Sequence, residues 1–344
     1  MTAKINAAES IRGLACLAVV FSHLAMSFFP FLHHFDPTET TDLNWVYQVH
    51  HLPLGFLYSG DAAVFVFFVL SGYVLSYAIL KKPEQFQSRL KSMMVKRYPR
   101  LMIPALTSCL IIWATLSIID IDSRHVGLWL QAFAQQDFSF KTALYEGTIG
   151  AFLFSDSNIN WVLWTMTIEL MGSFVLFFLL VLYQWKHGVF WLGSVLVLVL
   201  AYMWRGQGFC MGIASFVIGI YIYLYAKQLS ACFAVLLLIL GLYLAGAHNT
   251  SQTYSWLYAL WGEHTYDFSN FLAGPIIVYS VLMSPLLSKG LDRPILVWLG
   301  KLSFSIYLIH LLMLTLVCIP LFNLFLKWHW SYSQSAIFAG VLAI

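Results

Sequence analysis

Charge is scarce in this chain of 344 residues. Only 10% of the residues are Asp, Glu, Lys or Arg, whereas 60% are hydrophobic and 17% are aromatic. Because soluble domains carry about 25% charged residues, this composition excludes a water-soluble globule and indicates a helical membrane protein. The net charge of +3 is also too small to indicate nucleic acid as a partner.

Cysteine is rare and follows no pattern. The five cysteines fall inside apolar segments and lack the paired spacing of a metal site or a disulfide framework. We interpret them as small apolar packing residues. The chain also has no internal repeat, no low-complexity tract and no polar segment large enough for a second domain. We therefore expect residues 1–344 to form a single membrane-embedded domain.

Ten apolar runs, separated by polar residues, Gly or Pro, predict an all-α transmembrane bundle of about ten spans. The last run has only ten residues, about 15 Å of helix, so we expect that the chain lacks its natural C-terminal end. The first run has no small-residue cleavage site and should remain as a helix. The runs cover residues 11–30, 61–80, 102–119, 161–184, 189–204, 208–226, 232–247, 268–287, 296–318 and 335–344.

Basic residues collect in one alternate set of the predicted loops. Seven lie between Lys81 and Arg100, whereas eleven acidic residues, Asp61 among them, lie in or beside the opposite set. The positive-inside rule therefore predicts a cytoplasmic N-terminus and a multi-pass protein in a lipid bilayer.

Arg12 and His23 lie in or at the edge of the first apolar run, where ionisable side chains are costly. On a helix they are about 16 Å apart, and eleven steps of about 100° bring them to nearly the same face. That face would connect the cytoplasmic edge with the membrane interior. We therefore expect it to belong to a functional pathway or site.

Glu169 and His310 are also embedded in apolar spans. Counted from the predicted span ends, both lie in the outer half of the bilayer, as does His23. Because a carboxylate can orient an imidazole and raise its basicity, we expect the three to form an acid/base cluster. Ser71, which precedes Gly72, is interpreted mainly as a helix-packing residue.

The basic segment from Lys81 to Arg100 has two interpretations. It either holds the loop in the cytoplasm and contacts anionic head groups, or it forms a dedicated ligand site. Arg97 and Arg100 lie three residues apart, on one helix face, and guanidinium groups bind phosphate oxygens bidentately. A nucleotide-bearing cofactor would fit such a site.

Two histidine pairs, His33-His34 and His50-His51, lie in one loop of the acidic side. Adjacent histidines point apart, and no cysteine or matched carboxylate spacing accompanies them. We therefore predict no metal site.

Five segments carry a family signature when they are taken in order. They are residues 10–15 followed by His23, then residues 67–75, 96–104, 163–169 and 299–310. Together they resemble the motifs of the acyltransferase 3 family of integral-membrane acyltransferases. In the fourth segment, Thr165 and Thr167 replace two serines of the family pattern, and the residues after Glu169 also depart from it. The acceptor pocket would therefore differ from the common one.

The resemblance implies a stand-alone membrane O-acyltransferase without an attached SGNH domain. Such enzymes transfer an acyl group, usually acetyl from acetyl-CoA, to a hydroxyl of an extracytoplasmic carbohydrate such as lipopolysaccharide O-antigen, peptidoglycan or exopolysaccharide. The expected location is the inner, cytoplasmic membrane of a bacterium.

The resemblance and the residues together assign expected roles. His23 would act as a general base or, alternatively, as a nucleophile that briefly carries the acyl group. The expected catalytic residues are His23, Glu169 and Arg12; acyl-CoA would contact Arg97, Arg100, Arg12 and Ser71; the acceptor would contact His310, Trp164 and Asp61.

Two other functions use the same residues. Intramembrane His, Glu and Arg also form relays in proton-coupled transporters of sugars or organic anions, although repeated halves are not detectable here. A purely structural membrane subunit would leave Arg12, His23 and Glu169 unexplained.

Overall fold

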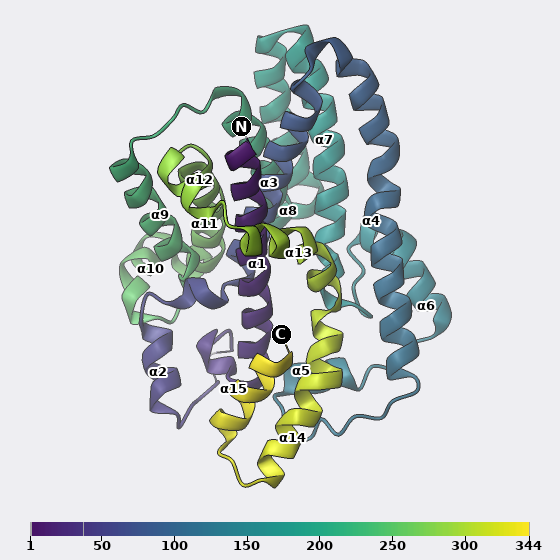
Figure 1. The fold of residues 1–344 in the computed structure, drawn as a ribbon, viewed down its shortest axis with the longest axis vertical. Helices are drawn as coiled ribbons and strands as arrows, with labels where there is room; N and C mark the ends of the chain where they lie inside the picture. The colour runs from purple at the N-terminus through teal and green to yellow at the C-terminus, as the bar shows by residue number, and fades with distance from the viewer. Residues whose placement is uncertain (1, 37, 344) are drawn as a thin grey trace.

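The computed structural model describes residues 2–36 and 38–343, and all regular structure among them is helical. Its long helices pack side by side, with α14 and α15 at the end away from the N-terminus (Figure 1). The α-helices are α1 (Thr2–Phe28), α2 (Asn44–His51), α3 (Gly60–Leu80), α4 (Phe86–Leu116), α5 (Leu128–Ala134), α6 (Phe140–Tyr145), α7 (Thr165–Trp185), α8 (His187–Tyr225), α9 (Ala231–Ala245), α10 (Ser255–Trp261), α11 (Thr265–Leu282), α12 (Pro285–Leu291), α13 (Pro294–Met313), α14 (Ile319–Lys327) and α15 (Tyr332–Ala343).

Short 3-10 and π-helical segments connect or extend these helices. The π-helices are η4 (Glu146–Phe154) and η8 (Leu314–Cys318). The 3-10 helices are η1 (Pro30–Leu32), η2 (Gly55–Tyr58), η3 (Pro83–Gln85), η5 (Trp161–Trp164), η6 (Gln252–Tyr254) and η7 (Gly262–His264).

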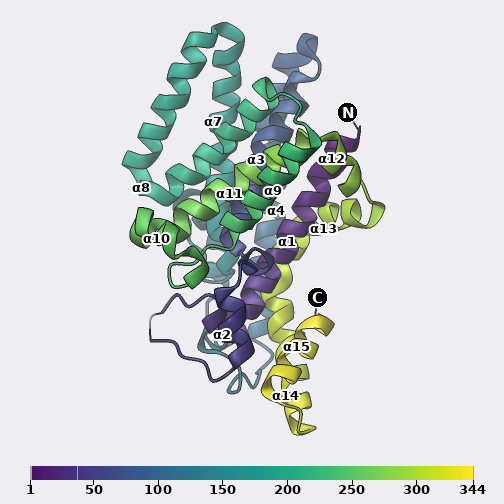
Figure 2. The same ribbon diagram turned by 90° about the vertical axis from the view of Figure 1, so that its left-hand side faces the viewer.

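Helix α8 consists of two arms that fold back on each other. Gly206 adopts φ 77° and ψ −165°, a conformation that interrupts the helix and favours glycine. Beyond it the chain reverses, so that the Tyr221 hydroxyl lies 3.0 Å from Ser194 Oγ and the ring of Tyr225 stacks on that of Trp191. The predicted runs 189–204 and 208–226 are therefore the two antiparallel arms of this one element (Figure 2).

Several helices are long and apolar enough to cross a membrane, as the composition predicts. Among the described residues there are six, or up to seven if the bent pair 252–282 and 285–291 forms one span. This supports a multi-pass membrane protein. The predicted count of ten spans is not confirmed, because α9 has only 15 residues and α15 only 12, and the two arms of α8 belong to one of the six apolar helices.

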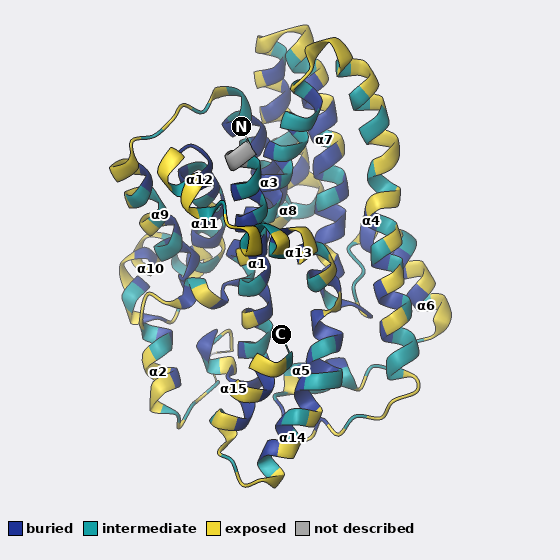
Figure 3. Cartoon of the chain, in the orientation of Figure 1, coloured by how far each residue is buried: buried dark blue, intermediate teal, exposed yellow. Residues whose placement is uncertain are grey.

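Buried residues lie mainly where helices face one another, and exposed residues lie on the outside of the bundle (Figure 3). Many of the exposed residues are large and apolar. On α4, Val95 and Ile103 are more than half exposed, and on α8 so are Leu192 and Met203. Water disfavours so large an apolar surface, whereas lipid accommodates it.

The two ends of the bundle differ in charge. The N-terminus of α1 and the start of α4 lie at the same end (Figures 1 and 2), which carries the basic residues of 81–100 and is called the basic end below. Helix α3 begins at the opposite end of the bundle. There Gly60 packs closely against α1, since a Cβ added at Gly60 would lie 2.9 Å from Ser22 Oγ.

Candidate active site

Helices α1 and α13 run parallel and in constant register. A Cβ added at Gly13 would lie only 2.8 Å from the backbone nitrogen of Gly300, so the two glycines let the backbones approach closely. Cys16 Sγ donates to the Ser303 carbonyl, and this pair, like His23 and His310 further along, is separated by 287 residues in the chain. The glycine contact thus places the two histidines opposite each other.

The imidazoles of His23 and His310 form a direct hydrogen bond. Nδ1 of His23 lies 2.6 Å from Nε2 of His310. The ring planes differ by 9° and the centroids are 4.9 Å apart, about the sum of the nitrogen separation and the two ring radii. The rings therefore meet edge to edge in nearly one plane, as a hydrogen bond between ring nitrogens requires.

The surroundings of His310 determine which nitrogen carries each proton. Nδ1–H of His310 donates to the Tyr307 carbonyl at 2.8 Å, so Nε2 of a neutral His310 must accept. Nδ1 of His23 is then the donor, and its Nε2 keeps a free lone pair. His310 is 4% exposed whereas His23 is half-buried, so the nitrogen without a proton belongs to the more accessible ring.

Trp129 of α5 packs against His23. The ring centroids of Trp129 and His23 are 5.0 Å apart, and the ring planes are nearly parallel. Trp161 in turn packs against the ring of Trp129, edge to face, with the centroids 5.2 Å apart. Neighbouring Asn160 is fully buried and donates to the Leu308 carbonyl, two residues before His310. Trp129 and Trp161 thus form an aromatic cover over His23.

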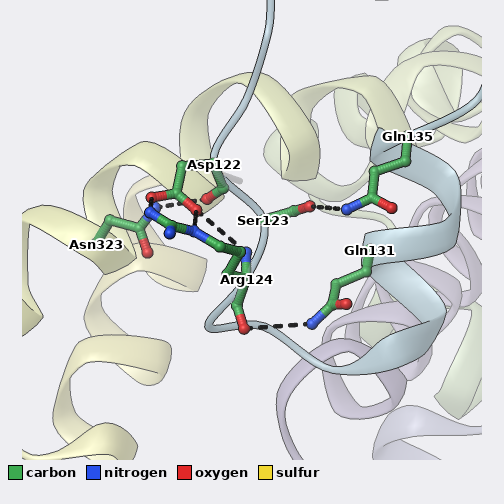
Figure 4. A network of polar contacts seen from close by, with 6 residues as sticks. All are labelled: Asp122, Ser123, Arg124, Gln131, Gln135 and Asn323. Carbon is green, nitrogen blue, oxygen red and sulfur yellow. Dashed lines mark hydrogen bonds and ion pairs between the residues drawn. The ribbon is translucent and has the colours of Figure 1, made fainter.

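A polar network fixes the position of α5 (Figure 4). Arg124 forms a bidentate ion pair with Asp122, whose carbonyl accepts from Asn323 of α14. Gln131 of α5 and Gln135, which directly follows α5, donate to the Val126 carbonyl and to Ser123 Oγ of the same loop. The loop is also tied to the end of α1, because Gly127 N donates to the Ser27 carbonyl.

Glu169 belongs to a different polar cluster. Its Oε1 accepts from Ser71 Oγ of α3 at 2.8 Å and forms an ion pair with Arg97 of α4. Arg97 Nε also donates to Ser173 Oγ at 2.7 Å. The side chains of Arg97 and Glu169 are only 13% and 14% exposed, so the pair satisfies charges that would otherwise be buried alone.

The expected cluster of two histidines and one carboxylate is therefore divided. Within the described part of the chain, no hydrogen bond joins Glu169 to His23 or His310. Tyr307 lies between the two clusters: its hydroxyl donates to the Val162 carbonyl, and its ring centroid is 6.1 Å from that of His310. It is also within electrostatic range of Glu169.

Ser71 and Gly72 have different roles, although helix packing was the role mainly expected of this pair. Gly72 packs against the second arm of α8, where a Cβ would lie 3.1 Å from Cα of Gly219, so close helix packing is its structural role. Ser71 instead donates to Glu169. Its hydroxyl is committed to the ion-pair cluster.

The three arginines that were expected to contact acyl-CoA occupy different environments. Arg12 is partly buried near the basic end and pairs with Glu9 at 2.8 Å. Arg97 points into the bundle toward Glu169, whereas Arg100 is exposed on α4 and forms no ion pair among the described residues. Arg100 is thus the most accessible of the three.

Asp61 and Trp164 line a common pocket. It has a volume of about 320 Å³ and lies where α3 and α7 begin, beside the reversal of α8. Arg205 and Asp267, which sequence reasoning did not select, line it as well. His310, the third residue expected to contact an acceptor, is not among its lining residues.

The loop histidines pack with a partner that sequence reasoning missed. His33 Nδ1 lies 3.3 Å from Nε2 of His248, and His50 bonds to the Leu32 carbonyl at 3.0 Å. Burial lowers the pKa of His33 and of His50 to about 4, and that of His248 well below its usual value. Among the described residues, no group of three or more His, Cys, Asp or Glu could hold a metal ion.

Besides His248, sequence reasoning missed Tyr307 and Trp129. Trp129 lies in a segment that appears in the sequence only as a loop, and His248 is a lone histidine after an apolar run. Tyr307, three residues before His310, had a signal: a hydroxyl one helical turn from a candidate site residue.

The site offers one partly accessible imidazole nitrogen that can accept a proton, oriented by a second imidazole. Such a group can serve as a general base or a nucleophile. In a comparison with protein families, a family model described as an acyltransferase domain matches residues 5–344. No curated protein and no solved structure matches the chain.

Proposed function

This chain belongs to that acyltransferase family, and from this premise we propose that it transfers an acyl group, in the simplest case acetyl, from acyl-CoA to a hydroxyl of an extracytoplasmic glycan such as O-antigen or exopolysaccharide. The protein is a membrane acyltransferase. The observation that carries the proposal is the His23–His310 bond, which leaves Nε2 of His23 free to take a proton from an acceptor hydroxyl.

The charge distribution supports the proposed direction of transfer. The basic residues of 81–100 gather at one end of the bundle, where Arg100 is exposed and suits the phosphates of CoA. We place this end in the cytoplasm of a bacterium, at the inner membrane, by the positive-inside rule. Arg12 then lies between this end and the histidine pair.

The chemical step uses His23 in two stages. As the acceptor oxygen attacks the thioester carbonyl, Nε2 of His23 takes the hydroxyl proton. When the carbon–sulfur bond breaks, the same nitrogen returns the proton to the departing thiolate, so protons and charge balance. His310 stabilises the imidazolium by accepting from its Nδ1–H.

A variant of this step has His23 carry the acyl group. Its Nε2 would attack the thioester and release CoA as the thiolate, leaving an acyl-imidazolium. The acceptor oxygen would then attack the acyl carbon, which frees the imidazole, and the hydroxyl proton released to solvent balances the one that the thiolate takes up. A trapped acyl-enzyme and ping-pong kinetics would support this order, whereas a requirement for both substrates together would support the base.

Mass spectrometry of surface polysaccharides tests the function. Cells that produce the chain should contain glycans heavier by about 42 Da per acetyl group, and base treatment should remove the increment because it hydrolyses esters. Cells without the chain should lack it. Identical spectra, or uptake of a sugar without acylation, would contradict the proposal.

A further inference from the structure

The pocket of about 320 Å³ that holds Asp61 and Trp164 is formed by four converging chain segments. Asp61 is the second residue of α3, Asp267 the third of α11, and Trp164 immediately precedes α7. Arg205 directly precedes the reversal at Gly206. All four lie away from the basic end, so on the proposed topology the pocket faces the extracytoplasmic side.

The polar groups of the pocket are held in place by neighbours. Arg205 donates to Ser155 Oγ at 3.0 Å and to the Leu153 carbonyl, and its guanidinium lies 4.9 Å from the ring of Trp204. Asp61 lies beside the side chain of Tyr266, within its electrostatic range. The guanidinium is thereby preorganised, as specific polar recognition requires.

The aromatic wall is available to a ligand. The side chain of Trp164 is 39% exposed and forms no hydrogen bond within the described residues. Behind it, Phe68 and Ile168 are buried and form an apolar floor. The pocket thus offers an indole face together with carboxylate acceptors and a guanidinium donor.

This combination selects among ligand classes. An anionic group would be repelled by Asp61 and Asp267, and an acyl chain would leave both carboxylates without partners. An uncharged pyranose satisfies all the groups, because its hydroxyls donate to carboxylates and accept from arginine while its apolar C–H face packs on an indole.

The pocket is a neighbour of the histidine pair. Gly60, which precedes Asp61, contacts Ser22, which precedes His23. On the other side, Thr165 follows Trp164 and bonds to the Tyr307 hydroxyl at 3.1 Å, and the Tyr307 carbonyl accepts from His310. The walls of the pocket are therefore in contact with α1 and α13, the helices that carry the histidine pair.

We propose that this pocket is an acceptor subsite, which binds an uncharged pyranose ring of the glycan next to the ring that is acylated. This inference rests on the proposed function, because it assumes that a glycan is the acceptor. It adds Asp267 and Arg205 to the residues expected to recognise that glycan.

Saturation-transfer NMR on the full chain in lipid nanodiscs tests the subsite. The protein must be prepared without maltoside or glucoside detergents, whose head groups would occupy the pocket. The probes are methyl pyranosides of glucose, galactose, mannose, rhamnose and N-acetylglucosamine, with methyl glucuronide as the anionic counterpart. Dodecyl β-glucoside in trace amount reports whether a lipid-linked sugar binds better than a free one.

We expect at least one neutral pyranoside to receive saturation through its C–H face and the glucuronide to receive none. Trp164→Ala and Asp267→Asn should weaken binding at least tenfold, whereas Trp164→Phe should retain most of it. Trp256→Ala, at another exposed tryptophan, is the control and should bind as the unmodified chain does.

Absence of binding by every neutral pyranoside, equal binding of the glucuronide, or equal binding by the Trp164 and Trp256 variants would overturn the subsite. His23→Ala should lose acyl transfer and still bind the pyranoside, because the subsite does not include His23. Binding by an unmodified chain that transfers no acyl group would leave the subsite standing while the proposed function fails. Acyl transfer by the unmodified chain without Trp164-dependent binding would overturn the subsite and leave the proposed function standing.

Discussion

His23 Nδ1 lies 2.6 Å from His310 Nε2, and the Tyr307 carbonyl accepts from the other nitrogen of His310. This chain of two hydrogen bonds fixes the proton positions in both rings, because only one neutral arrangement satisfies it. The nitrogen left without a proton is Nε2 of His23, on the ring that is half-buried rather than fully enclosed. The account of catalysis depends on this relationship.

Replacing His310 should reduce turnover through the orientation of His23. His310→Leu removes the acceptor for His23 Nδ1–H, and we expect kcat to fall by about 10²-fold or more. His310→Gln retains a carbonyl acceptor and should lose less. CoA release by the purified chain, measured with a thiol reagent in the presence of acceptor polysaccharide, gives both rates. Equal losses in the two variants would contradict a positioning role.

The Arg97–Glu169 ion pair should show strong energetic coupling. Because both side chains are largely buried, Arg97→Met or Glu169→Gln alone leaves a buried charge and should destabilise the fold by about 3–5 kcal/mol. The double variant removes both charges and should be less destabilised than the sum of the single changes. Thermal unfolding of the unmodified chain, the two single variants and the double variant in one detergent measures this coupling. Strict additivity would show that the pair does not interact.

The reversal of α8 should depend on glycine at one position. Gly206 has φ +77°, so Gly206→Ala should destabilise by about 1 kcal/mol although nothing lies within 4 Å of the added Cβ. Gly208 has equally open space without the positive φ, and Gly208→Ala is the matched control, expected to be neutral or slightly stabilising. Chemical denaturation compares the two. A similar effect at both positions would refute the backbone explanation.

The loop histidines should make the end opposite the basic end sensitive to acid. Burial lowers the pKa of His33 and His50 to about 4, below the unfolded value of about 6.5. Between these values the unfolded loops bind protons that the folded loops do not, so stability is lost as pH falls through this window. Each histidine contributes a slope of up to about 1.4 kcal/mol per pH unit.

Hydrogen exchange of residues 29–36 and 44–52 measures this opening between pH 7 and pH 4. His33→Phe removes one titrating group while keeping a ring against Phe35, and it should flatten the pH dependence. His264→Ala, at an exposed histidine, should leave the dependence unchanged. An unchanged slope in the His33 variant would exclude this origin.

Much of the fold could be predicted from apolar runs, because lipid requires long helices whose backbone groups are satisfied internally. The bounds of α3 and α7 follow from this pattern to within a few residues, whereas α1 begins at Thr2, well before its apolar run. The return of α8 at Gly206 was visible as two runs with a short break. The broken and short elements were less predictable, since a run of 15 apolar residues in α9 does not reveal whether it crosses, tilts or ends early.

The depth of each site residue along its helix could be predicted from the sequence. The partner that each residue contacts could not, because it depends on tertiary packing. His23 and His310 were expected at one depth, and their helices do bring them together. Depth alone could not show that Glu169 faces Arg97, because the partner of a residue depends on the rotation of each helix about its axis. The position of Trp129 against His23 depends on a loop network that no sequence periodicity encodes.

The most direct test is the rate of acetyl transfer to acceptor polysaccharide by purified His23→Ala in nanodiscs, beside the unmodified chain and His264→Ala. If Nε2 of His23 is the group that takes the hydroxyl proton or the acyl group, His23→Ala should lose at least about 10²-fold in rate at an unchanged unfolding temperature, and His264→Ala should lose nothing. Transfer by His23→Ala at the rate of the unmodified chain would contradict the account.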